Sequence, residues 1–326
     1  MKNTAAHALG LALMPALIMM IFSQCKQKTD DRPQADAGYV PLKISLAQWS
    51  LHRAFQGGTL DPAQFARIAK EDYGITAVEY VNSFYKDRGN DVGFWNGMRA
   101  RADSLGVRSL LIMVDEEGDL GNPDAVARGQ AVANHHKWVD AAAILGCHSI
   151  RVNAFGDGAR DEVKAALIDG LKQLCAYAAE KNINVIIENH GLFSSDAEWV
   201  VEVIKSVDMP NCGTLPDFGN WCLGAKWGST EGGKCEDAYD RYQGIAAFLP
   251  FARGLSAKSY GFGEDGEEKD IDYARMLKLM LEAGFDGYVG IEYEGSGLSE
   301  PDGIRATRAL LEKSWERIMA GKPSGQ

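Results

Sequence analysis

The chain has 326 residues, of which 46% are hydrophobic and 24% charged, and its formal net charge is −11. A chain of this length and apolar content can bury a large core, which excludes an intrinsically disordered tail, a collagen-like repeat and a small disulfide scaffold. The balance of 34 Lys+Arg against 45 Asp+Glu argues against nucleic acid as a partner, because binding to a phosphate backbone rests on Lys and Arg.

Residues 1–24 are predicted to be a signal peptide, since Lys2 precedes an apolar run over residues 8–22. That run is shorter than the ~20 residues of a membrane-spanning helix and fits a secretory h-region. Cys25 then opens a polar tether (25–40), as in a bacterial lipoprotein signal, where this cysteine is lipidated. We expect an exported, periplasmic or outer-membrane lipoprotein that contacts the membrane only through its lipid anchor. Plain secretion with an unmodified Cys25 is the alternative.

After the tether, short β-type runs alternate with longer amphipathic stretches. The predicted strands cover residues 43–49, 77–81, 109–114, 149–152, 184–188, 213–217, 254–258 and 288–292. Apolar spacing of 3.6 residues and helix signals predict helices that include residues 125–145, 161–181, 270–283 and 303–319.

Helix boundary signals agree with this alternation. Asp61 and Pro62 are typical of an N-cap followed by proline at the first helical position, and Gly146 and Gly284 stand where a helix end favours a left-handed residue. Strands that alternate with helices predict a parallel sheet, and eight such units predict one α/β domain, a (β/α)₈ TIM barrel over residues 41–322. A doubly wound open sheet is the alternative, but no Gly-rich phosphate turn follows the first strand.

Two cysteines flank a glycine-rich loop between the sixth and seventh predicted strands. An exported protein is free to form disulfides, so we predict a bond between Cys222 and Cys235 that closes this loop.

Carboxylates stand at the ends of three predicted strands. In a TIM barrel the active site lies at the C-terminal ends of the strands, which here carry Glu188, Asp217 and Glu292. Burying several carboxylates together is costly unless a cation neutralises them, so these three are predicted to bind a divalent metal. Oxygen ligands favour Mn²⁺ or Mg²⁺ over Zn²⁺. In the alternative interpretation, each carboxylate lies in a loop or pairs with Arg or Lys.

Three segments, Ile-Glu-Asn-His (187–190), Pro-Asp-Phe-Gly-Asn (216–220) and Gly-Ile-Glu-Tyr-Glu-Gly (290–295), resemble the sugar phosphate isomerase/epimerase family of xylose-isomerase-like barrels. In that family a Glu, an Asp, a His and a Glu bind one metal, and the two glutamates exchange protons with the substrate. The resemblance implies the ligands named above, with Glu188 and Glu292 as the acid/base pair. Ser256 stands where the family has its His, so the fourth ligand would be His190 or water.

The resemblance implies a divalent-metal-dependent isomerase or epimerase that works through an enediolate. Lys258 would stabilise the enolate oxygen, or else pair with a neighbouring carboxylate. An exported protein without a phosphate cradle is expected to act on an unphosphorylated sugar or keto-sugar. The expected substrate-binding residues are His190, Trp49, Asn153 and Asn220.

Two other functions remain as alternatives. The same site would also support a lyase or hydratase acting on a keto-sugar. A non-catalytic, lipid-anchored sugar-binding protein is consistent with the missing histidine of strand seven. A third relative by fold, the metal-dependent DNA endonuclease, is a poor match. It needs a His-rich zinc cluster, whereas this chain has 6 His and the adjacent His135 and His136 lie in a predicted helix, away from the strand ends.

Overall fold

The computed structural model describes residues 40–321. The predicted signal peptide (1–24), Cys25 and nearly all of the tether lie outside the described residues and stay predictions. Within residues 40–321 no helix is both long and apolar enough to cross a membrane.

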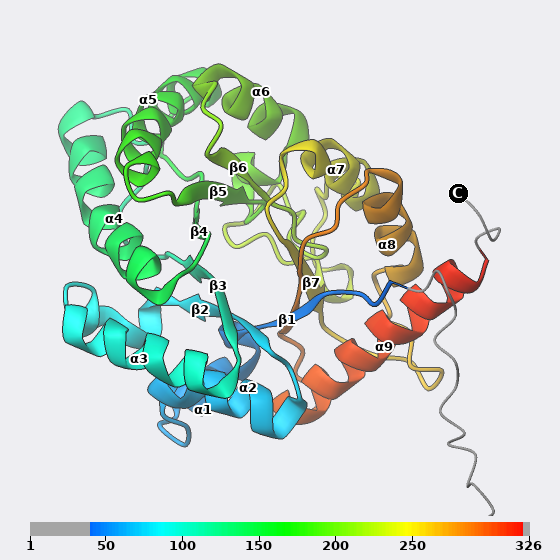
Figure 1. Cartoon of the computed structure of the whole chain (residues 1–326). Helices are drawn as coiled ribbons and strands as arrows, with labels where there is room; N and C mark the ends of the chain where they lie inside the picture. The colour runs from blue at the N-terminus through cyan, green and yellow to red at the C-terminus, as the bar shows by residue number, and fades with distance from the viewer. Residues whose placement is uncertain (1–39, 322–326) are drawn as a thin grey trace, which may run out of the picture. The chain divides into compact units, whose positions relative to one another are not determined.

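Eight parallel strands form one curved sheet at the centre of the fold (Figure 1). In sheet order they run β6-β5-β4-β3-β2-β1-β8-β7. The strands are β1 (Ile44–Ala47), β2 (Ala77–Val81), β3 (Arg108–Met113), β4 (Ser149–Val152), β5 (Asn184–Glu188), β6 (Cys212–Leu215), β7 (Leu255–Ser259) and β8 (Val289–Tyr293).

Backbone hydrogen bonds join the two ends of this sheet. The Arg253 N–H donates to Thr214 O and the Phe218 N–H donates to Ser256 O, each over 3.0 Å. Parallel bridges pair the same two segments. The sheet therefore closes between β6 and β7, and the predicted TIM barrel is confirmed.

The α-helices of residues 40–321 form an outer ring around the strands (Figure 1). They are α1 (His52–Gln56), α2 (Phe65–Tyr73), α3 (Val92–Leu105), α4 (Ala125–Leu145), α5 (Arg160–Ala179), α6 (Ala197–Val207), α7 (Arg241–Phe248), α8 (Tyr273–Glu282) and α9 (Glu300–Ala320). The capping residues predicted from the sequence lie at the ends of several helices. The Asp61 side chain accepts a hydrogen bond from Ala63 N–H, and φ is 79° at Gly146 and 69° at Gly284.

Several predicted strand boundaries were wrong by one or two residues, and two of the shifts have a local cause. The first strand stops at Ala47 because Gln48 turns the chain into a 3-10 helix, η1 (Gln48–Leu51). The Gln48 side chain accepts a hydrogen bond from Val81 N–H and donates one to Tyr85 Oη, which anchors this turn. The sixth strand stops before Pro216, which has no N–H to donate to a ladder.

Apolar side chains fill the inside of the barrel below the strand ends. This inner cluster consists of Ala47, Val81, Leu111, Met113, Ile186 and Leu215. A larger apolar layer lies between the strands and the ring of helices. Because both layers exclude water, polar side chains at the C-terminal strand ends enter an environment in which any charge needs a partner.

Candidate active site

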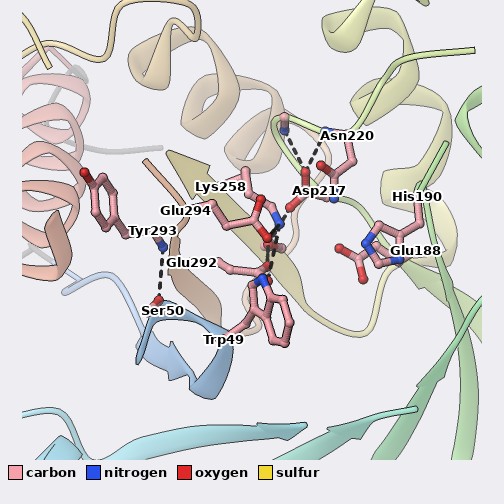
Figure 2. Close-up of polar contacts among 12 residues, drawn as sticks. Trp49, Ser50, Glu188, His190, Asp217, Asn220, Lys258, Glu292, Tyr293 and Glu294 are labelled. Atoms are coloured by element: carbon pink, nitrogen blue, oxygen red, sulfur yellow. Dashed lines mark hydrogen bonds and ion pairs between the residues drawn. The ribbon is translucent and has the colours of Figure 1, made fainter. Parts of the chain in front are cut away.

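Three acidic side chains converge at the C-terminal ends of β5, β6 and β8 (Figure 2). Glu188, Asp217 and Glu292 are buried, and each offers one carboxylate oxygen within 4.8 Å of the other two. The structure thus brings together the three residues that the sequence singled out, because closing the barrel places the ends of β6 and β8 near each other.

Two basic side chains partly balance this charge. Arg151 Nε lies 2.7 Å from Glu188 Oε2, and Arg151 Nη1 donates to Asp115 Oδ1 over 2.6 Å.

On the other side of the site, Lys258 Nζ lies 3.3 Å from Glu292 Oε1 and 3.0 Å from Glu294 Oε1. The pairing that was the alternative for Lys258 is therefore the arrangement observed (Figure 2). Together with Asp217, the site holds five carboxyl groups and two cations, so full ionisation leaves an excess of negative charge.

A single hydroxyl lies between two of the carboxyl groups. Ser256 Oγ is 2.6 Å from Asp217 Oδ2 and 2.7 Å from Glu292 Oε2, but a hydroxyl has only one proton to donate. Burial, with a further contribution from the Glu292 charge, raises the pKa of Asp217 to about 7. Burial also raises the pKa of Glu188 well above its ordinary value, although the Arg151 charge opposes the shift. Three buried oxygen donors with this unbalanced charge fit a divalent cation.

His190 lies beside the carboxylates but outside their group. Its Nδ1 is 2.7 Å from Asn153 Oδ1, and Asn153 Nδ2 donates to Asp115 Oδ1 over 2.7 Å. Burial, reinforced by the Arg151 charge, lowers the pKa of His190 well below its ordinary value. The ring is therefore neutral at physiological pH, and the asparagine fixes its orientation.

A cavity of about 280 Å³ opens above the carboxylates. Of the predicted residues, Trp49, His190 and Glu292 line it, whereas Glu188 and Asp217 are not part of its lining. The full lining is Trp49, Val81, Ser83, Met113, Asp115, Glu116, Arg151, His190, Trp227, Glu292 and Glu294.

Two predicted substrate-binding residues do not line this cavity. Asn153 lines a neighbouring cavity. Asn220 is buried and does not line the first cavity, and its backbone N–H donates to Asp217 Oδ1 over 2.7 Å, as does that of Gly219. Asn220 therefore holds Asp217 in place.

Sequence reasoning assigned no role to Arg151, Asp115 or Glu294. The two-residue period of a strand could have pointed to two of them, because it places Arg151 on the same strand face as Asn153 and Glu294 on the same face as Glu292. Which acid each base contacts depends on strand register, which the periodicity does not specify.

The loop after β6 carries the predicted disulfide. Cys222 and Cys235 are bonded, with an S–S distance of 2.06 Å. The loop places Trp227 against the edge of the His190 ring, with 4.9 Å between the ring centroids. The disulfide thus closes a loop that forms one wall of the cavity.

Two curated relatives match the sequence. A putative hydroxypyruvate isomerase from Mus musculus is 23% identical over 240 residues, which is 68% of this chain and 80% of that protein. A 3'-dehydrocarminate deglycosidase alpha subunit from a Microbacterium species is 32% identical over 57 residues, and this match spans 18% of the chain and only 16% of that protein.

Solved structures share the fold. D-psicose 3-epimerase from Clostridium cellulolyticum H10 superposes with a TM-score of 0.62 at 15% identity, over 85% of this chain and 99% of that one. For 3-keto-D-glucoside 4-epimerase from E. coli the TM-score is 0.61 at 15% identity, over 83% and 99% of the two chains. The sequence profile of the xylose isomerase-like TIM barrels matches residues 66–314, most of the described chain. The protein belongs to the xylose isomerase-like TIM barrel family.

Proposed function

We propose that the protein is a divalent-metal-dependent isomerase or epimerase of an unphosphorylated sugar or keto-sugar. The observation that carries the proposal is the convergence of Glu188, Asp217 and Glu292 at the strand ends beside the cavity. The names of the relatives and structural neighbours support it, since they include a hydroxypyruvate isomerase, a sugar epimerase and a keto-glucoside epimerase.

The charge of the cavity favours an uncharged substrate. Asp115, Glu116, Glu292 and Glu294 line it, and its one lining cation, Arg151, already pairs with two acids. Even with a divalent ion bound, the five carboxyl groups of the site outweigh the charges of Arg151, Lys258 and the metal, so a sugar phosphate would bring further negative charge into an acidic lining. The indole ring of Trp49 offers an apolar surface of the kind that packs against the C–H groups of a sugar ring.

In the proposed mechanism the chain's own residues move the proton. Glu188, Asp217 and Glu292 would hold the metal, preferably Mn²⁺ or Mg²⁺, which supplies Lewis-acid polarisation of substrate oxygens. One glutamate of the pair Glu188 and Glu292 takes the proton from the carbon next to the carbonyl, and the other returns a proton. Arg151 and Lys258 hold these two carboxylates in position from opposite sides.

A second candidate is elimination from, or addition of water to, a keto-sugar. The short match to a deglycosidase subunit favours it. Lys258 does not line the cavity, so in this reaction too it would act through its ion pairs with Glu292 and Glu294.

One experiment tests both candidates. The purified protein is stripped of metal, reloaded with Mn²⁺, Mg²⁺ or Zn²⁺, and incubated in D₂O with a panel of free sugars and keto-sugars. Isomerisation or epimerisation gives an isomer of the substrate in which deuterium replaces a carbon-bound proton, whereas elimination gives an unsaturated product. Both are resolved by NMR. The proposal is wrong if no carbon-bound proton of any substrate exchanges with solvent deuterium, whichever of the three metals is present.

The Glu188→Gln variant tests the assignment of the acid/base pair. We expect its exchange rate to fall at least about 10²-fold, since a general base typically contributes that much. The exposed Glu198→Gln variant is the matched control and is expected to keep the full rate.

We also propose that the protein is exported and lipidated at Cys25. The proposal rests on the sequence of residues 1–40. Mass spectrometry of the amino-terminal peptide from membranes is expected to show a diacylglyceryl cysteine, and Cys25→Ala is expected to release the protein into the soluble fraction. An unmodified Cys25 would contradict this proposal.

A further inference from the structure

A second cavity, of about 120 Å³, lies beside the first. It is lined by residues that follow β3, β4 and β6, namely Glu117, Asp119, Asn153, Phe155 and Lys226, among others. Two side chains, Glu116 and Trp227, line both cavities. The two spaces are therefore adjacent, with these two residues at their junction.

The two residues at the junction share an unusual backbone conformation. Among the described residues, five that are not glycine have positive φ, and they include Glu116 at 61° and Trp227 at 72°. For a bulky residue such as tryptophan this conformation costs free energy and persists only where the surroundings impose it. Such residues cluster at binding sites. Both strained residues thus lie at the boundary between the cavities.

The loop that carries Trp227 is firmly held. Lys226 forms an antiparallel bridge with Gly191, which directly follows His190. A Cβ atom on Gly191 would lie 2.0 Å from Ala225 O, so the loop backbone packs directly against this glycine. The disulfide closes the loop at its base, and the loop presents an indole that is 42% exposed.

The chemistry of the second cavity matches an uncharged, hydroxyl-rich group. Asp119 provides an acceptor and Lys226 a donor, whereas Glu116 and Glu117 already pair with Lys86 and Lys137. The Lys226 ammonium lies 4.6 Å from the centre of the Phe155 ring, and this ring meets that of Trp227 edge to face at 5.6 Å. The charges of this lining are balanced, and rings beside hydrogen-bonding groups suit an uncharged sugar.

We propose that the second cavity binds a second, uncharged ring attached to the sugar that reacts. The substrate would then be a glycoside or disaccharide rather than a free monosaccharide. This inference rests on the proposed function for its first subsite, but its test reads binding alone.

The test compares the binding of monosaccharides with that of glucose- and galactose-containing disaccharides, by saturation-transfer NMR and calorimetry on the metal-loaded protein. At least one disaccharide is expected to bind about tenfold more tightly than its constituent monosaccharides. Lys226→Ala and Asp119→Asn alter residues that line only the second cavity. Each is expected to weaken disaccharide binding about three- to tenfold, the worth of one hydrogen bond, without changing monosaccharide binding.

Trp49→Ala is the matched control, because Trp49 lines only the first cavity, and it is expected to weaken both classes of sugar. The inference is overturned if no disaccharide binds more tightly than a monosaccharide, or if the second-cavity variants weaken both classes equally. Disaccharide binding without proton exchange would leave the subsite standing and contradict the proposed reaction. If monosaccharides exchange a proton but disaccharides bind no more tightly than monosaccharides, the proposed reaction stands and the second subsite is contradicted.

Discussion

The hydroxyl of Ser256 lies 2.6 Å from the carboxyl group of Asp217, at the seam where β6 and β7 close the barrel. The same oxygen lies 2.7 Å from Glu292. The residue that replaces the expected histidine thus joins two of the proposed metal ligands through one proton, and several consequences of this arrangement are measurable.

Removing this hydroxyl is expected to destabilise the metal-free protein. Ser256→Ala leaves two buried carboxyl groups without their shared donor, which should lower the free energy of unfolding by about 1–3 kcal/mol. Urea denaturation with and without Mn²⁺ measures the effect, which should shrink when the metal is bound. Ser314→Ala is the control, since the buried Ser314 hydroxyl has no hydrogen-bond partner among the described residues, and it should change stability little. Equal losses in the two variants would contradict the role given to Ser256.

Divalent metal is expected to stabilise the folded protein. A ligand that binds only the native state at 100 times its Kd raises the free energy of unfolding by about 2.7 kcal/mol. Asp217→Asn keeps the side-chain size and an acceptor for the Gly219 and Asn220 N–H groups, but removes one charged ligand. We expect this variant to lose most of the stabilisation by Mn²⁺, and Glu198→Gln to keep it. If Asp217→Asn responds like the wild type in calorimetric melting, the metal binds elsewhere.

Arg151 is expected to be essential for stability. Arg151→Met leaves Asp115 and Glu188 without their cation in a buried site, which typically costs about 3–5 kcal/mol. Arg88→Met serves as the control, because Arg88 forms an exposed pair with Asp91 that is worth at most about 1 kcal/mol. Chemical denaturation of both variants checks the difference. A small effect of Arg151→Met would mean that the carboxyl groups are protonated rather than paired.

The burial of Glu79 is expected to make the free energy of unfolding depend on pH. This carboxyl group is buried inside the barrel, where Ser45 Oγ donates to it over 2.6 Å, and burial raises its pKa from 4.5 to about 7. Between these values the folded state holds a proton that the unfolded state has released. The contribution of Glu79 to the free energy of unfolding therefore falls as pH rises from about 4.5 to about 7 and is constant above.

Replacing Glu79 with glutamine isolates this contribution. Glu79→Gln keeps an acceptor for Ser45 and cannot ionise, so its advantage over the wild type should grow across that window by roughly 3 kcal/mol. Urea denaturation at a series of pH values measures it, and Glu198→Gln should show no such trend. A difference between Glu79→Gln and the wild type that is independent of pH would show that Glu79 does not carry the raised pKa.

Much of the fold follows from local patterns. The helix over 125–145 and the strands over 77–81, 149–152 and 184–188 were predicted with their observed bounds, because apolar periodicity and left-handed glycines depend only on neighbouring residues. The other strand bounds moved by one or two residues, and at Gln48 and Pro216 the cause is a side chain or a proline that acts on the backbone.

The amino-acid sequence alone determined that eight strands alternate with helices and that Glu188, Asp217 and Glu292 stand at strand ends, because the period of the side chains sets which residues face the core. Only the tertiary structure decided which charges meet. It pairs Arg151 with Glu188 and Lys258 with Glu292, and it buries Asn220 behind Asp217. Such contacts join residues far apart in the chain and depend on strand register and barrel closure, which no local pattern specifies.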